Sequence, residues 1–246
     1  MCKKTMLFVS LVIVIFFILL PFSNLCAQEE AGVSIENGGM GYSIFGQSMI
    51  NLDDLNAALE SKGYTGMSNS FFAVGGGGHA IINNRLIIGG EGQTLLGDAA
   101  TSGNFKNSIN ISQVFLNLGY VVYKIKDLRI YPLIGLGAGA MNLNISEEMT
   151  ALSMEDVLNN PKRSIEMSTG GFLFNLSLGA DYLLNFGGDE TGRAGMVLGI
   201  RAGYKVSPFK GDWMVEDVDV TGAPKMGMTG PYISFMLGGG GIAVKK

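Results

Sequence analysis

The chain has 246 residues and a net charge of −4, and only 15% of its residues are charged, against roughly 25% in ordinary soluble domains. The acidic balance argues against nucleic acid as a partner. Both cysteines, Cys2 and Cys26, lie in the first 27 residues. A mature chain that begins at Gln28 therefore has no disulfide, no zinc–thiolate cluster and no cysteine nucleophile.

The N-terminal segment has the order of an export signal. Lys3 and Lys4 precede an apolar run over 6–20, and Ala27 follows a stretch that suits cleavage. The run is short for a spanning helix, which needs about 20 residues. We therefore expect 1–27 to be a cleaved signal peptide and 28–246 to be the mature chain, which forms one domain.

Eight later segments show the alternation of side chains that a β-strand produces. The pattern is clearest where Phe174 and Leu176 alternate with Asn175 and Ser177. One face of such a strand is apolar and the other is small or polar, as in a transmembrane barrel. The expected strands are 40–50, 71–82, 85–96, 108–123, 128–143, 171–184, 195–207 and 230–242.

The connections between these segments alternate in length. Asn83-Asn84 is a two-residue hairpin signal, and the turns at 124–127 and 185–194 are the other short connections. An even number of strands puts all short turns on one side, with both termini, and all long loops on the other side. The long loops are 51–70, 97–107, 144–170 and 208–229.

Two of the long loops contain helix signals. Asn51 precedes a stripe of Leu52, Leu55 and Leu59, and Gly63 follows as a stop. A shorter helix is expected after Ser153. We expect both helices to pack over the barrel mouth. In the last loop, Trp213-Met214-Val215 stands beside Glu216, Asp217 and Asp219. We expect a plain solvated loop here. Apolar groups exposed for a partner or a hydrophobic ligand are one alternative, and a Ca²⁺ site is another, although the spacing fits no EF-hand loop.

Aromatic residues gather near both ends of the expected strands, as the two interfaces of a membrane select. This pattern predicts two aromatic belts. The belt at the short-turn end contains Tyr120, Tyr123, Tyr131 and Tyr182, and the belt at the long-loop end contains Phe172, Tyr204 and Tyr232.

Five charged residues are expected to point into the lumen, and these are Arg85, Glu91, Asp181, Arg201 and Lys205. The third and seventh strands lie opposite each other in an eight-stranded ring, so Glu91 and Arg201 can meet across the lumen. Charges in a narrow interior must be paired or hydrated. The hypothesis is a lumen plugged by polar residues, with an ion or proton path as the functional alternative.

The sequence offers little for catalysis. His79 is the sole histidine, and the residues after it include no serine, unlike the His–Ser arrangement of lipid-A-modifying barrels. A single histidine without mature cysteines also makes a metal site with nitrogen or sulfur ligands improbable. We expect a non-enzymatic protein without a catalytic residue, cofactor or metal.

The chain resembles the small eight-stranded outer-membrane barrels of the OmpA-transmembrane-domain and OmpX type over about 40–242. The resemblance implies that 28–246 is an outer-membrane β-barrel domain: an all-β, antiparallel, up-and-down transmembrane β-barrel with eight strands in a Gram-negative outer membrane, with short helices in its external loops. One departure is that the last strand runs through 238–241, four glycines, and ends without the usual closing aromatic residue.

The expected role is structural or surface-interacting, with outer-membrane lipid around the barrel and an external partner reached through the loops. A transport or binding barrel for a small hydrophobic molecule is one alternative. A soluble lipocalin-like barrel of the periplasm, with its apolar face turned inward, is another.

Overall fold

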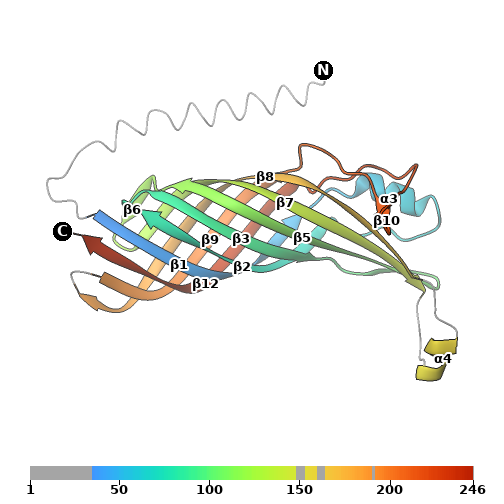
Figure 1. The fold of residues 1–246 in the computed structure, drawn as a ribbon, viewed down its shortest axis with the longest axis horizontal. Coiled ribbons are helices and arrows are strands. Elements are labelled where there is room, and N and C mark those ends of the chain that lie inside the picture. Colours follow the sequence, from blue (N-terminus) through green and yellow to red (C-terminus); the bar gives the residue numbers. More distant parts are fainter. Residues whose placement is uncertain (1–34, 148–152, 160–163, 190–191, 246) are drawn as a thin grey trace, which may run out of the picture.

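The structure is a computed structural model that describes residues 35–147, 153–159, 164–189 and 192–245. The expected signal peptide over 1–27 lies outside these residues. Twelve strands form one antiparallel sheet (Figure 1). The eight longest are β1 (Ile35–Met49), β2 (Ser70–Ile82), β3 (Leu86–Leu96), β5 (Phe105–Tyr120), β7 (Leu128–Glu147), β8 (Ser164–Asp189), β9 (Gly192–Val206) and β12 (Gly230–Lys245).

These eight strands close into a ring. Each pairs with its neighbour in the chain, and β12 pairs antiparallel with β1 from Ile35↔Lys245 to Ser48↔Tyr232. Closure leaves no free edge along this seam, which is the condition for a sheet that crosses hydrocarbon. The predicted fold class, an eight-stranded antiparallel up-and-down transmembrane barrel, is confirmed.

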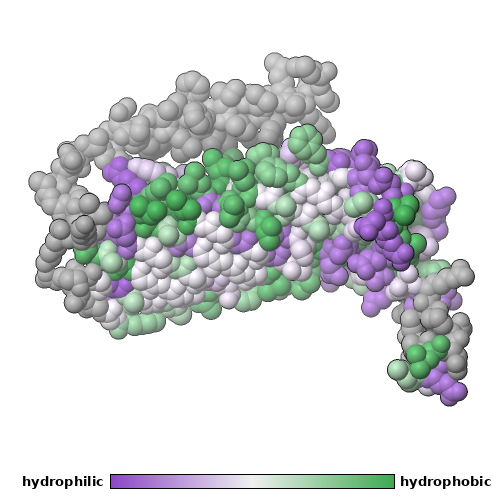
Figure 2. Space-filling model, in the orientation of Figure 1, coloured by the Kyte–Doolittle hydropathy of each residue, from purple (hydrophilic) through white to green (hydrophobic). Residues whose placement is uncertain are grey.

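The strand faces alternate between lipid and lumen. Leu176, Leu198 and Ile200 are each more than 40% exposed, whereas Asn175 and Arg201 are buried in the lumen. Figure 2 shows hydrophobic patches and near-neutral surface over the barrel wall, and hydrophilic surface gathered at the loop end. The lipocalin-like alternative requires the opposite orientation and is excluded by this arrangement.

Four short strands extend the ring at its ends. They are β4 (Ala100–Ser102), β6 (Tyr123–Ile125), β10 (Met214–Val215) and β11 (Val218–Asp219). The strand expected over 108–123 ends instead at Tyr120, because β6 turns back to pair with the start of β7. The strands on both sides of the expected 185–194 turn are also longer than predicted.

The connections are arranged as the sequence predicts. At the tight turn between β2 and β3, Asn83 and Asn84 have φ angles of 51° and 65°, the left-handed geometry of a two-residue hairpin. The start of β1 and the end of β12 lie at this short-turn end, and the long loops lie at the other end (Figure 1).

The two loop helices behave differently. Helix α3 (Asp53–Glu60) buries Leu55 and Leu59 against the barrel mouth, as expected. Helix α4 (Met154–Asn159) instead stands away from the barrel (Figure 1), with Met154 and Leu158 exposed by 73% and 69%. No helix in the described part of the chain has the length and hydropathy needed to span a membrane.

The predicted aromatic belts need two corrections. Tyr131 is 0% exposed and Tyr232 is 8% exposed, so both rings lie inside the lumen. Side chains two positions apart lie on the same face of a strand, and the residues two positions from each of these tyrosines point inward. Both tyrosines therefore point inward as well. The other predicted belt residues face outward, and they are Tyr120, Tyr123, Phe172, Tyr182 and Tyr204.

A matched pair of leucines tests which surface lies in lipid. Leu116 is 76% exposed on β5, and Leu158 is 69% exposed on α4. Leu116→Arg should destabilise the barrel by about 2–4 kcal/mol, because arginine is costly near the bilayer midplane. Leu158→Arg should change stability by less than about 0.5 kcal/mol. Urea unfolding in lipid vesicles, followed by the fluorescence of Trp213, measures both, and equal effects would contradict a lipid-facing Leu116.

Candidate functional site

The lumen is filled in layers, and the layer under the external loops is apolar. Leu52, Leu55 and Leu59 of the first loop pack with Phe71 of β2 and Trp213 of the last loop. Trp213 is only 1% exposed, and its Nε1–H donates to the carbonyl oxygen of Pro224 at 3.0 Å. Trp213 therefore fits neither the expected solvated loop nor the alternative of an apolar group exposed for a partner, because the loop folds its ring into the barrel mouth.

A charged pair occupies the centre of the lumen. The guanidinium of Arg201 on β9 donates to the carboxylate of Glu91 on β3. The two side chains are 2% and 4% exposed. Arg201 Nη2 also donates to the hydroxyl of Tyr42 on β1 at 3.4 Å. Opposite walls of the barrel are therefore joined by a buried ion pair, the juxtaposition that the strand order predicts.

A second polar group lies toward the short-turn end. The hydroxyl of Tyr131 donates to Asp181 Oδ2 at 2.8 Å, and His79 Nε2 lies 3.3 Å from the same oxygen. These rings fit because their neighbours lack side chains: a Cβ at Gly179 would stand 2.5 Å from the ring of Tyr131. A substitution at Gly179 would therefore collide with the ring.

Lys205 on β9 is a further buried charge. Its ammonium donates to Gln113 Oε1 at 2.7 Å and lies 4.6 Å from the ring centroid of Tyr232. Tyr232 in turn donates its hydroxyl proton to Asn175 Oδ1 at 3.0 Å. This group links β5, β8, β9 and β12 just beneath the apolar layer.

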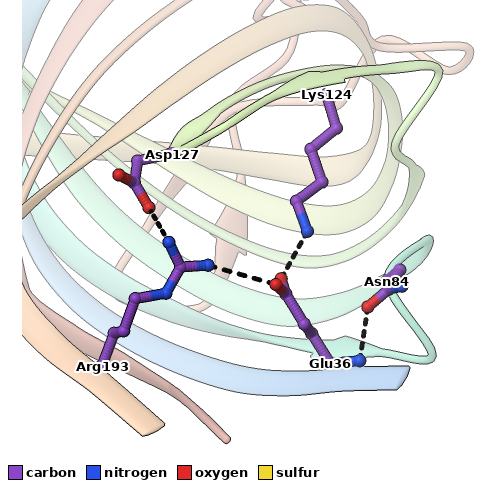
Figure 3. A network of polar contacts seen from close by, with 5 residues as sticks. All are labelled: Glu36, Asn84, Lys124, Asp127 and Arg193. Carbon is purple, nitrogen blue, oxygen red and sulfur yellow. Dashed lines mark hydrogen bonds and ion pairs between the residues drawn. The ribbon is translucent and has the colours of Figure 1, made fainter. Parts of the chain in front are cut away.

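An ion-pair network closes the short-turn end (Figure 3). The carboxylate of Glu36 accepts hydrogen bonds from Lys124 at 2.5 Å and from Arg193 at 3.1 Å, and Arg193 also donates to Asp127 at 2.7 Å. The backbone N–H of Glu36 donates to the side chain of Asn84. The start of β1 is thereby tied to the β2–β3 turn, to β6 and the turn that follows it, and to the start of β9.

Arg85 needs a correction. It was expected in the lumen, but it is exposed at the start of the β3 hairpin, where it donates to the hydroxyl of Tyr120 at 3.1 Å. The residue precedes β3 (Leu86–Leu96) and so does not share the alternation of that strand. The lumen filling is also not polar alone, because a second apolar cluster around Ile87, Leu133 and Val197 fills the short-turn half.

Sequence reasoning missed several inward polar residues. Gln93, Gln113 and Asn175 share their strand faces with residues already expected in the lumen, so the alternation could have found them. The ion-pair network at the short-turn end was missed for another reason. Glu36 precedes the expected first strand, and Arg193 lies within the turn expected over 185–194. The alternation of strand faces therefore does not predict that these two side chains meet.

Comparisons with known proteins give only distant structural matches. No known protein family and no curated protein matches the sequence. Among solved structures, Ail, the attachment invasion locus protein of Yersinia pestis, matches with 12% identity and a TM-score of 0.43, covering 85% of this chain and 99% of Ail. A major outer membrane protein of Thermus thermophilus matches with 11% identity and a TM-score of 0.45, covering 85% and 98%. OprG of Pseudomonas aeruginosa matches with 14% identity and a TM-score of 0.36, covering 85% and 96%.

At these identities and TM-scores the matches carry no argument about this chain. The class of protein follows from the strand pairing and from the apolar exterior of the ring. The chain is a small transmembrane β-barrel with eight strands in its ring.

The central ion pair gives a test of the lumen. Glu91→Gln leaves the Arg201 guanidinium buried without a carboxylate, so we expect a loss of about 3–5 kcal/mol in the free energy of unfolding. Glu166→Gln removes an exposed charge on β8 and should cost less than about 0.5 kcal/mol. The double variant Glu91→Met, Arg201→Met should recover much of the loss. Urea unfolding followed by Trp213 fluorescence measures these differences, and a Glu91→Gln variant as stable as the wild type would contradict the pairing.

Proposed function

We propose that the chain is a non-enzymatic protein of the bacterial outer membrane, which holds four external loops at the cell surface on a sealed barrel. The observation that carries this proposal is the filling of the lumen from end to end. Apolar side chains occupy the external mouth, charged and amide groups the centre, and an ion-pair network the short-turn mouth.

The external end supports a role in surface interaction. The β7–β8 hairpin continues beyond the neighbouring β9, since β8 begins at Ser164 but its pairing with β9 begins at Phe174↔Val206. Helix α4 is carried on this extension, with its apolar residues Met154 and Leu158 exposed. A scaffold that exposes such a segment suits contact with an external partner better than passage of a solute.

The alternative, a barrel that holds a small hydrophobic molecule, would use the apolar layer under the loops. Leu52, Leu59 and Trp213 already occupy that space as a packed cluster. A hydrophobic ligand would have to displace α3 and the last loop, so the sealed scaffold is the better-supported function.

Conductance tests the sealed barrel. The purified protein, inserted in a planar bilayer, should show no steady open channel, because the described lumen is closed by packed side chains over several layers. A pore-forming barrel reconstituted in the same way gives the positive control. A stable, large conductance in the wild type would contradict the proposal.

With the signal peptide cleaved after Ala27, as the sequence predicts, the mature chain has no cysteine, and this allows a labelling test of orientation. A Thr221→Cys variant places a thiol in the last long loop, and an Arg85→Cys variant places one beside a short turn; both positions are exposed. In intact cells a membrane-impermeant maleimide should label the first and spare the second, and both should react after the outer membrane is permeabilised. Labelling of Arg85→Cys in intact cells would reverse the assigned orientation.

A further inference from the structure

The outward side of β5, β7 and β8 changes from apolar to polar between neighbouring rows of the sheet. Two successive rows across these strands are apolar, and they are Leu116–Leu136–Phe174 and Val114–Ala138–Phe172. The next two rows toward the external end carry polar, uncharged side chains beside the small residues Ala140 and Gly170. These polar side chains are Ser112 and Asn110 on β5, Asn142 on β7 and Ser168 on β8, and we call them the Asn/Ser face.

The strand pairing makes the Asn/Ser face continuous. Asn110 pairs with Asn142, and Asn142 pairs with Ser168, so these three side chains form one row across the sheet. Asn110, Ser112 and Asn142 are exposed, whereas Ile111, between the first two, is buried. The polar side chains therefore stand on the same side of the sheet as the lipid-facing Leu116.

The level of this face follows from the length of a membrane-spanning strand. A strand crosses the hydrocarbon of a bilayer in about 9–11 residues. Tyr120 faces outward at the short-turn end, and about ten residues along β5 lead from it to Asn110. On β8 the outward Phe172, at the long-loop end, comes just before Ser168 is reached. The lipid-facing band thus continues directly into the Asn/Ser face, which lies beside the headgroups of the outer leaflet.

The Asn/Ser face has hydrogen-bonding groups but no charge. On the outward side of the described parts of these strands, the first charges beyond it are Glu166 and Lys106, one and two rows further out. Phosphate groups are bound chiefly by arginine and lysine, which this face lacks. A serine hydroxyl or an asparagine amide both donates and accepts hydrogen bonds. Sugar hydroxyls have the same two capacities, so the face matches a carbohydrate better than a phosphate.

The polar groups of this face are available to a ligand. Among the described residues, no partner within the protein holds the side chains of Asn110, Ser112 and Asn142. Other exposed amides at this end are engaged, since Gln47 donates to Ser70 Oγ at 2.6 Å.

We propose that the Asn/Ser face binds the sugar headgroups of glycolipids in the outer leaflet, an inference that rests on the outer-membrane placement proposed above. The amides of Asn110 and Asn142 exchange hydrogen bonds with sugar hydroxyls. The apolar rows around Leu116 and Phe172 contact the acyl chains of the same lipids. Because no charge takes part, the contact does not depend on ionic strength.

Lipid composition tests this face. The mature chain is folded into phosphatidylcholine vesicles that contain equal molar amounts of either lipid A or a rough lipopolysaccharide with a short core, so that the samples differ in the core sugars. Urea unfolding followed by Trp213 fluorescence should give a higher midpoint with the lipopolysaccharide, and equal midpoints would overturn the proposal. The difference should persist from about 0.1 to 0.5 M sodium chloride. Its loss at high salt would assign the contact to charged groups and overturn the proposal as well.

Alanine variants locate the contact. Loss of either amide, in Asn110→Ala or Asn142→Ala, should lower the sugar-dependent gain in the folding equilibrium constant about fivefold. The control Asn104→Ala removes an exposed amide that lies about 20 Å from Asn110 along the direction of β5, and it should keep the wild-type gain. A full gain in the double variant Asn110→Ala, Asn142→Ala would show that the sugars bind elsewhere and would reject the face.

Side-chain resonances give a direct observation that needs no variant to fold. In wild-type protein labelled with ¹⁵N-asparagine, the amide signals of Asn110 and Asn142 should shift between nanodiscs that contain lipid A and nanodiscs that contain the rough lipopolysaccharide. The signal of Asn104 should stay in place. Unshifted signals of Asn110 and Asn142 would reject the face. This result depends on neither conductance nor orientation in cells, so its failure is distinct from failure of the proposed function.

Discussion

The closed ring of backbone hydrogen bonds is the constraint on which the rest of this structure depends. Hydrocarbon offers no partner to a backbone N–H or C=O, so a sheet can cross a membrane only when its last strand pairs with its first. In this chain β12 and β1 make that pairing along almost their whole length. A ring of only eight strands has a narrow interior, so every inward side chain must pack against its neighbours.

The lumen accordingly behaves as a protein core with an unusual share of polar groups. Large rings fit where the neighbouring residue is a glycine; the ring of Tyr131, for example, lies over Gly179. Charges are buried where a partner reaches them from another strand, as Glu91 reaches Arg201. An ion pair of this kind gives little net stability compared with an apolar pair, but removal of one partner is costly. The polar centre thus fixes how opposite walls of the barrel face each other.

Much of the fold could be predicted from the sequence because the alternation of a strand is a local signal. The face that carries Asn175 and Arg201 in the sequence pattern is the inward face in the structure. The same alternation would have placed Tyr131 and Tyr232 inside, but their chemical type suggested an interface. Contacts between distant segments, such as Glu36 with Arg193, depend on the tilt and stagger of the ring, which no local pattern contains.

The ion pairs of Glu36 have a consequence for how the barrel opens. Arg193 stands on β9, and β12 lies between β9 and β1, so its contact with Glu36 reaches across the closing seam. Separation of β12 from β1 therefore breaks this contact as well as the backbone pairing. Contacts that are absent from the folding transition state slow unfolding and leave the folding rate unchanged. If the Glu36–Arg193 pair is of this kind, its contribution belongs to the lifetime of the closed barrel in the membrane.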